Sequence, residues 1–286
     1  MPDALVDALD LVVTRRVARG LPGDRRAPGV GAGTELAQLR PYQVGDDVRH
    51  IDPAATARTG EPHVRMHVPE RTLTTWIALD VSPSMAFGTT ARLKADVAEG
   101  VALVLGRLAV RRAGAVGLVR FGFGEQAHVM APRGAKPGLV ALRRALGEGV
   151  APDGRGHPRA LADALARIGR VARGPGVVAI LSDFRDQRDW ERPLGALRVH
   201  HAVIAIEIGD PREAEVPAVG RLALIDPETG RRVEVDTSSP QLRARFAALE
   251  QERRAGVARE LRRLHVDHVC LSTEDDWLVT LGRRLR

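Results

Sequence analysis

The sequence has 286 residues, 44% of them hydrophobic, and a formal net charge of +7. This length allows one large α/β domain with a modest appendage, and the hydrophobic content is ordinary for a protein with a buried core. No stretch reaches the roughly 18 consecutive apolar residues of a membrane span, and the N-terminus lacks the features of a signal peptide. We therefore expect a soluble, cytoplasmic protein without a membrane partner.

The positive charge comes almost entirely from arginine, because Lys94 and Lys136 are the only lysines. The arginines are spread along the chain and interleaved with acids, and aromatic residues, which stack on bases, make up only 3% of the sequence. Arginines on solvated faces explain this pattern better than a nucleic-acid-binding patch does. A nucleic-acid partner is therefore not expected.

Cysteine and histidine do not indicate a zinc site. Cys270 is the only cysteine, which excludes an internal disulfide and a thiolate metal cluster. It lies in an apolar run, which predicts a buried, unreactive thiol. His265 and His268 are three residues apart in a predicted strand, so they face opposite sides and are not expected to share a metal.

The first 70 residues are expected to form an N-terminal part of their own. Residues 3 to 19 have apolar side chains at helical spacing and end in arginines, which predicts a helix. A Gly-, Pro- and Arg-rich loop follows over residues 21 to 33, and residues 63 to 68 alternate as in a strand.

Between these, residues 39 to 58 are dense in acids and arginines around the only tyrosine. Such density is found at catalytic sites, but more often it is a charge-paired network that fixes an irregular segment. The predicted ion pairs join Arg40, Arg49 and Arg58 to Asp46, Asp47 and Asp52.

From about residue 71, short apolar strands alternate with amphipathic helices. Strands are expected over 74–80, 114–121, 126–130, 177–181, 202–208 and 266–271, and helices over 94–112, 139–146, 160–171, 190–197, 239–264 and 275–285. A hairpin insertion is expected at about 219–236, around the turn at residues 226–230. The pattern predicts an α/β domain over 71–286, with a mostly parallel sheet and helices on both faces.

Two of the apolar strands end in acidic residues. Asp80, Ser82 and Ser84 follow the strand over 74–80, and Asp183 follows the strand over 177–181. Ligand sites in open α/β sheets lie beyond the carboxyl ends of the strands, so these side chains should meet at one edge. Carboxylates and hydroxyls alone suit Mg²⁺ or Mn²⁺ and suit zinc poorly.

These motifs together resemble domain-of-unknown-function family 58, bacterial and archaeal proteins related to von Willebrand factor A domains. The residues that match the family pattern are Arg40, Tyr42, Gly45, Asp46, Asp47, Arg49, Asp52 and Arg58, followed by a strand and Asp80-x-Ser82-x-Ser84-Met85. The chain departs from the pattern at Pro53, where the family usually has tryptophan. The resemblance covers the chain from about Gly33 onward and implies a von Willebrand factor A-like, Rossmann-like fold.

The same resemblance implies a metal-ion-dependent adhesion site. Ser82 and Ser84 would bind the metal directly, and Asp80 and Asp183 directly or through water. A loop threonine normally completes this set, but the corresponding loop, residues 154–159, contains no threonine or serine. Water could take its place, or Arg159 could pair with Asp183 and replace the metal.

Such a site favours binding over catalysis, because neutral serines leave the charge of the cation under-compensated and attract a partner's carboxylate. The expected function is a non-enzymatic interaction or adaptor module, and the resemblance implies a MoxR-type AAA+ ATPase as the partner. The alternative is a metal-dependent phosphohydrolase that uses Asp80. Against it, Ser82 stands where the haloacid-dehalogenase pattern needs a second aspartate, and common catalytic motifs are absent.

Overall fold

The computed structural model describes residues 35–68, 73–89, 92–124, 127–186 and 189–284. The helix expected over residues 3 to 19 lies outside the described residues. The chain divides into two compact units, one within Gly23–Thr72 and a larger one from Leu73 onward.

The smaller unit is a two-stranded antiparallel sheet with one short helix. Strand β1 (Glu35–Pro41) pairs with β2 (His63–Val68), and a 3-10 turn (Val48–His50) and helix α2 (Pro53–Thr59) lie between them in the chain. Helix α2 begins where the Asp52 carboxylate accepts the N–H of Ala55 and proline fills the first position. Pro53, where the family usually has tryptophan, therefore serves as a helix start.

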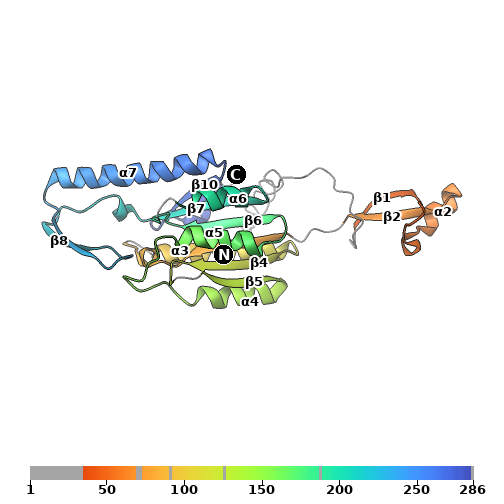
Figure 1. Ribbon diagram of the computed structural model, residues 1–286, viewed down its shortest axis with the longest axis horizontal. Helices are drawn as coiled ribbons and strands as arrows, with labels where there is room; N and C mark the ends of the chain where they lie inside the picture. The colour runs from red at the N-terminus through yellow and green to blue at the C-terminus, as the bar shows by residue number, and fades with distance from the viewer. Residues whose placement is uncertain (1–34, 69–72, 90–91, 125–126, 187–188, 285–286) are drawn as a thin grey trace. The chain divides into compact units, whose positions relative to one another are not determined.

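The larger unit is built on a six-stranded sheet in the order β10-β7-β6-β3-β4-β5, with only β5 antiparallel to its neighbour (Figure 1). Its strands are β3 (Thr74–Asp80), β4 (Ala115–Phe121), β5 (His128–Gly134), β6 (Gly176–Ser182), β7 (His201–Gly209) and β10 (Asp267–Ser272). Its helices are α3 (Lys94–Arg111), α4 (Ala135–Leu146), α5 (Ala160–Val171), α6 (Glu191–Arg198), α7 (Pro240–Arg263) and α8 (Trp277–Arg284). Strand β3, whose last six residues are buried, lies inside the sheet between β4 and β6.

Apolar side chains fill both faces of this sheet. On one face, Ile77 and Leu79 of β3 pack with residues of α3, α4 and α8. On the other face, Trp76 and Ala78 of the same strand pack with residues of α5, α6 and α7. Alternation along a strand sends successive side chains to opposite faces, so a strand covered on both sides is apolar throughout. The predicted α/β fold is confirmed.

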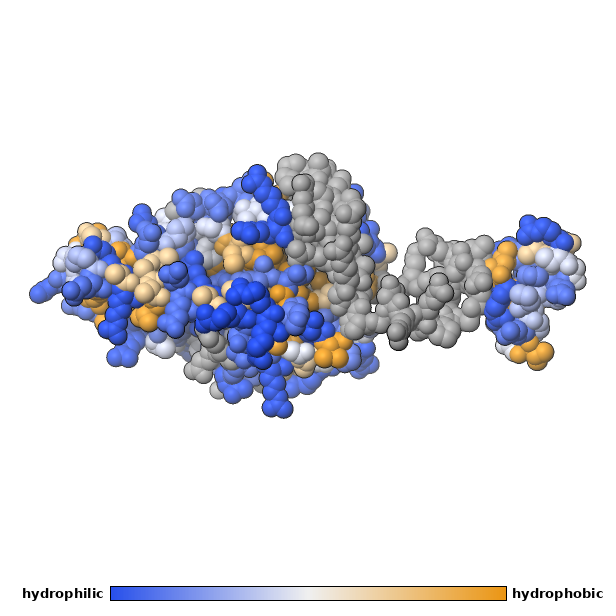
Figure 2. Space-filling view, turned by 90° about the horizontal axis from the view of Figure 1, so that it is seen from above, coloured by the Kyte–Doolittle hydropathy of each residue, from blue (hydrophilic) through white to orange (hydrophobic). Residues whose placement is uncertain are grey.

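A separate hairpin of β8 (Arg221–Ile225) and β9 (Arg232–Asp236) lies between β7 and α7 in the chain. Its turn is closed by the carboxylate of Asp226, which accepts the N–H of Glu228 and the hydroxyl of Thr229. The outer surface of the molecule is largely hydrophilic with smaller apolar patches in the view of Figure 2, as expected for a chain with 28% charged residues. Within the described residues, no helix is long and apolar enough to cross a membrane.

Candidate functional site

The polar ends of β3 and β6 lie side by side at the carboxyl edge of the sheet. The two strands are parallel neighbours, with Leu79 opposite Leu181, so Asp80 and Asp183 emerge next to each other. Four of the predicted site residues are almost fully buried, with exposed fractions between 2% and 5%: Asp80, Ser82, Ser84 and Asp183. A buried cluster of this kind has to satisfy its charges internally or with a bound ion.

The two serines lie in a short 3-10 turn (Pro83–Ala86) directly after β3. The N–H of Ser82 donates to Asp80 Oδ1 at 2.9 Å, and the Ser82 and Ser84 hydroxyls lie 3.1 Å apart. Gly122 packs against the backbone of this turn. Its φ is +95°, and a Cβ at this position would lie 2.6 Å from the Ser82 nitrogen. Glycine at 122 thus allows the close backbone approach that positions Ser82.

Asp80 is held on both of its oxygens. Oδ2 accepts the Ser182 hydroxyl at 2.6 Å, while Oδ1 accepts the Ser82 N–H. Burial, and next the neighbouring charge of Asp183, raise the pKa of Asp80 to about 7 despite these hydrogen bonds. Asp80 therefore keeps its proton up to about neutral pH when no cation is bound.

The cation nearest to Asp183 is Lys94, which the sequence analysis did not select, and Arg185 Nε lies farther away, at 3.8 Å. Its side chain has no exposed surface, and its Nζ lies 2.6 Å from Asp183 Oδ2 and 2.5 Å from Glu213 Oε1. Burial opposes charge on both partners, but the mutual attraction lowers the pKa of Asp183 and raises that of Lys94, so the pair is ionised. Lys94 is the first residue of α3, and that position aims its side chain into the site.

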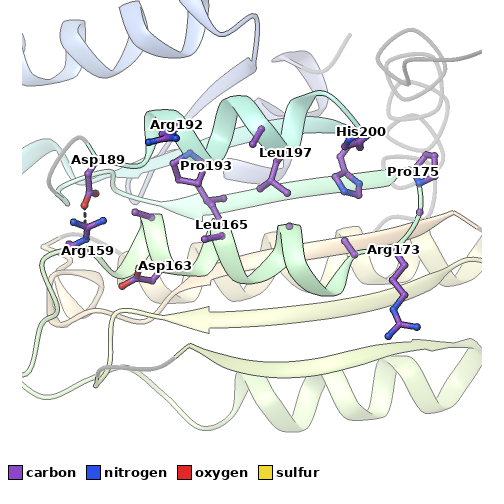
Figure 3. A pocket seen from close by; sticks show the side chains of 17 residues that line it. Arg159, Asp163, Leu165, Arg173, Pro175, Asp189, Arg192, Pro193, Leu197 and His200 are labelled. Carbon is purple, nitrogen blue, oxygen red and sulfur yellow. Dashed lines mark ion pairs between the residues drawn. The ribbon is translucent and has the colours of Figure 1, made fainter.

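The prediction that Arg159 could pair with Asp183 is wrong. Arg159 pairs with Asp189, with Nε 3.0 Å from Oδ2, and is 62% exposed. Figure 3 shows this pair at one end of a groove of about 770 Å³ between α5 and α6. Arg159 therefore pairs with Asp189, and the ion pair of Asp183 is formed with Lys94 instead.

Two further carboxylates, Asp186 and Glu228, belong to the site and were not predicted. Asp186 Oδ2 accepts the N–H of Leu161 at the start of α5, 2.7 Å away. Burial, with the charge of Asp80 adding to it, raises the pKa of Asp186 to about 8. Burial likewise raises the pKa of Glu228.

Glu228 comes from the turn of the β8–β9 hairpin. Its Oε1 accepts the N–H of Ser84 at 3.0 Å. The hairpin turn also docks on the loop that lacks the expected threonine, since Gly154 N–H donates to Pro227 O and Gly156 N–H to Glu228 O. Backbone hydrogen bonds from the loop over residues 154–159 therefore hold the hairpin turn in place, and the turn places the Glu228 carboxylate in the site.

An arginine network continues behind Asp183. Arg185 Nη2 lies 3.2 Å from Glu250 Oε1 of α7, and Arg253 of the same helix bonds Glu250 and donates to the carbonyls of Asp183 and Phe184. The network anchors the loop after β6 to α7, so that the position of Asp183 is fixed by two elements.

The donor set is compatible with Mg²⁺ or Mn²⁺. All donors are oxygens, and the hydroxyl separation of 3.1 Å between Ser82 and Ser84 is close to the ~2.9 Å between neighbouring ligands of an octahedral ion with bonds of about 2.0–2.1 Å. Burial is the largest cause of the raised pKa values of Asp80 and Asp186, and a bound cation would favour the ionised form of both carboxyls. The residues that would hold such an ion are Asp80, Ser82, Ser84 and Asp183. The ion would offset the charge of the carboxylates and would act as a Lewis acid toward an incoming ligand.

The family-motif residues of the smaller unit form ion pairs and turns. Arg40 pairs with Asp46 at 2.7 Å and Arg49 with Asp47 at 2.9 Å. Asp52 does not pair with Arg58, as the sequence suggested, but with Arg65 of β2, 2.6 Å away. The bridge between Ile51 and Val64 brings Arg65 of β2 beside Asp52, and a pairing of this kind is not visible in local spacing.

Tyr42 and Gly45 of this motif shape the loop after β1. The N–H of Tyr42 donates to Pro62 O at 2.8 Å, and Gly45 has a φ of +108°, which favours glycine. Arg58 lies in the last turn of α2, where a cation suits the helix dipole.

Comparison with known proteins places this architecture in a family. The family model described as "Protein of unknown function DUF58" matches residues 38–256, which takes in the motif of the smaller unit and the polar edge of the sheet. The chain belongs to the DUF58 family.

Relatives of this DUF58 protein include uncharacterized proteins of Mycobacterium tuberculosis and Mycobacterium bovis. Each is 37% identical over 283 residues, which cover 98% of this chain and 87% of the relative. Among solved structures, an aerotolerance-related membrane protein from Bacteroides fragilis is similar, with 14% identity, 74% of this chain and 98% of that chain covered, and a TM-score of 0.46. The VWA domain of SpRpn10 has 15% identity, 73% and 93% coverage, and a TM-score of 0.38.

Proposed function

We propose that this DUF58 protein is a non-enzymatic interaction module that binds an acidic side chain of a partner protein through a Mg²⁺-type adhesion site. The observation that carries the proposal is the arrangement of Ser82 and Ser84, whose hydroxyls lie 3.1 Å apart between Asp80 and Asp183. Neutral hydroxyl ligands leave a divalent cation with residual positive charge. An incoming carboxylate is the natural ligand for that charge.

The surroundings of Asp80 support binding over phosphohydrolase chemistry. A nucleophilic carboxylate needs an oxygen that is free to attack, whereas Asp80 is 4% exposed and accepts hydrogen bonds on both oxygens. Asp80 is better suited to orient the Ser82 turn and to balance charge.

Glu228 supports the acidic nature of the partner group. Its carboxylate already lies against the Ser84 N–H, so the site accommodates one acidic side chain from within the chain. In the proposed mechanism a partner's aspartate or glutamate takes the place of Glu228, and the β8–β9 hairpin moves aside. The resemblance to MoxR-associated proteins makes a MoxR-type AAA+ ATPase the partner to test first.

Calorimetric titration with Mg²⁺ and Mn²⁺ tests the metal. We expect binding heat and a higher melting temperature for the native protein, both lost in the Ser82→Ala/Ser84→Ala double variant. Asp163→Asn, an exposed change on α5, serves as the control and should bind like the native protein. Absence of heat and of a thermal shift in the native protein contradicts the metal site.

A pull-down experiment with a MoxR-type ATPase from the same organism tests the partner. Immobilised native protein should retain it in Mg²⁺ and release it in EDTA, and the double serine variant should not retain it. Retention that is equal in Mg²⁺ and EDTA contradicts capture through the metal.

A further inference from the structure

A second group of side chains of types that can bind metal lies on β7 and the edge strand β10, next to the arginine network behind Asp183. Glu207 Oε2 and His268 Nε2 are 2.9 Å apart, and Cys270 Sγ lies 3.5 Å from the same ring nitrogen and 3.9 Å from Glu207 Oε2. The three atoms lie within 4.8 Å of one another. A carboxylate oxygen, an imidazole nitrogen and a thiol thus converge on one point.

Strand geometry explains the convergence. His268 and Cys270 are two residues apart in β10, so they face the same side of the sheet, and Cys270 lies directly opposite Glu207 in the parallel pairing with β7. Strand β10 is the last strand of the sheet. Glu207 is 6% exposed, whereas Cys270 is exposed, which corrects the expectation of a buried thiol. A cation can therefore reach the group from solvent.

The separations match one face of a tetrahedral site. Around a zinc ion with bonds of about 2.0–2.3 Å, ligand atoms lie roughly 3.3–3.7 Å apart. The observed separations of 2.9, 3.5 and 3.9 Å bracket this range, so a shift of a few tenths of an ångström in the side chains would complete the site.

A nucleophilic triad explains the geometry less well. In a thiol–imidazole–carboxylate relay, the acid holds one ring nitrogen and the thiol uses the other. In this protein both Glu207 and Cys270 approach Nε2 of His268. Because both groups approach the same nitrogen, the thiol has no ring nitrogen of its own, as a proton relay requires.

An outer partner orients the carboxylate. Arg253 Nη2 of α7 contacts Glu207 Oε1 at 3.4 Å, which leaves Oε2 directed at His268. Arg253 is itself held by Glu250, 2.9 Å away. Support of a ligand by a second shell of this kind is typical of metal sites in proteins.

We propose that Glu207, His268 and Cys270 form a binding site for a borderline-soft divalent cation of the zinc class, with a fourth coordination position open to solvent. A thiolate and a carboxylate together supply two negative charges, which balance such an ion when the imidazole is neutral. Sulfur and nitrogen ligands separate this site from the oxygen-only adhesion site, which suits Mg²⁺.

The test uses the full-length protein in excess Mg²⁺, which occupies oxygen sites, and in a non-thiol reductant. Zn²⁺ is titrated in competition with a chromophoric chelator. We expect one tight equivalent for the native protein, and a loss of affinity of at least about tenfold in Cys270→Ser and in His268→Gln. His128→Gln, an exposed histidine on β5, is the matched control and should bind like the native protein.

A second measurement needs no variant. Because Cys270 is the only cysteine, alkylation of the native protein reports on this site alone. Zn²⁺ should slow alkylation at least tenfold, and Mg²⁺ should not. Equal Zn²⁺ affinity in the native protein and His268→Gln, or alkylation that Zn²⁺ leaves unchanged, overturns the proposal. The adhesion-site variant Ser82→Ala/Ser84→Ala should retain Zn²⁺ binding, which keeps the two proposals separable.

Discussion

Lys94 Nζ lies 2.6 Å from Asp183 Oδ2, and neither side chain is more than 3% exposed. The same ammonium reaches Glu213 Oε1, and Arg185 Nε lies 3.3 Å from that oxygen, so two cations face these two carboxylates. A buried pair of this kind is strongly destabilised when one partner is removed, because the other is left as an uncompensated charge. Lys94 is thus both a structural cation and a neighbour of any metal at Ser82 and Ser84.

The Lys94→Met variant separates these two roles. Without metal, we expect the free energy of unfolding to fall by about 3–5 kcal/mol, the usual cost of breaking a buried pair. With Mg²⁺, part of this loss should return, because the ion takes over the neutralisation of Asp183. Denaturant unfolding in EDTA and in Mg²⁺ measures both quantities.

Lys136→Met is the control for this change. Lys136 is the only other lysine and is exposed on α4, so its loss should alter stability by less than about 0.5 kcal/mol. If Lys94→Met is as stable as Lys136→Met in EDTA, the buried pair does not form.

Asp186 makes the stability of the metal-free protein depend on pH. Burial, together with the charge of Asp80, raises the pKa of Asp186 to about 8 from 3.8. Between these two values the folded protein holds a proton that the unfolded chain has released, so stability decreases as pH rises through this window. Below about pH 4, Asp186 is protonated in both the folded and the unfolded protein, so it no longer makes stability depend on pH.

The Asp186→Asn variant removes this titration while keeping an oxygen that can accept the Leu161 N–H. We expect the variant to gain stability relative to the native protein as pH rises from 5 to 8, by at most about 1.4 kcal/mol for each pH unit. Urea unfolding in EDTA at the two pH values measures the gain. The control is Asp163→Asn, an exposed change on α5, which should show no such trend. If the gain for Asp186→Asn is the same at both pH values, Asp186 is not the group that titrates in this range.

The sequence identified the part of the site that is local in the chain. Asp80 and Asp183 follow apolar runs directly, and parallel strands bring such ends to one edge of a sheet. Lys94 could not be found in this way, because a lysine at the start of an amphipathic helix normally lies in solvent. Glu228 was hidden for another reason, since its contact with Ser84 spans 144 residues and depends on how the hairpin docks.

The edge cluster shows the same limit. The spacing of His268 and Cys270 by two residues is visible in the sequence and places them on one face of a strand. Their partner Glu207 lies on β7, and only the strand order β10-β7 makes it a neighbour. An apolar run also suggested that Cys270 is buried, but an edge strand leaves part of its face open.

Gly122 is expected to control the geometry of the adhesion site. A Cβ at this position would lie 2.6 Å from the Ser82 nitrogen and 2.8 Å from its Cα, and these are backbone atoms that cannot rotate away. Gly122→Ala should therefore displace the Ser82 turn, lower stability by about 1–3 kcal/mol and weaken Mg²⁺ binding.

Gly124→Ala is a close control for this substitution. Gly124 also has a positive φ, +69°, but nothing lies within 4 Å of a Cβ built there. It should therefore show the backbone strain without the clash, with a cost of about 1–2 kcal/mol and unchanged Mg²⁺ affinity. Mg²⁺ titration of both variants measures the difference, and equal affinities would show that Gly122 does not position Ser82.

Glu228 provides the last test, and its first measurement, hydrogen exchange at Ser84, needs neither metal nor partner. Its carboxylate accepts the N–H of Ser84 at 3.0 Å, and Ser84 is 3% exposed. In Glu228→Ala that amide loses its acceptor, worth about 1 kcal/mol, so its hydrogen exchange should accelerate roughly fivefold. Glu228→Gln keeps a carbonyl acceptor and should retain most of the protection.

Glu234→Ala on strand β9 of the same hairpin is the matched control, because Glu234 is exposed and makes only a loose pair with Arg232 at 3.9 Å. It should leave the exchange of Ser84 unchanged. If Glu228 also occupies the place of a partner's acidic group, Glu228→Ala should bind the ATPase partner more tightly in Mg²⁺, while Glu234→Ala should not. Exchange at Ser84 that is the same in Glu228→Ala and the native protein would mean that the hairpin does not close the site in solution.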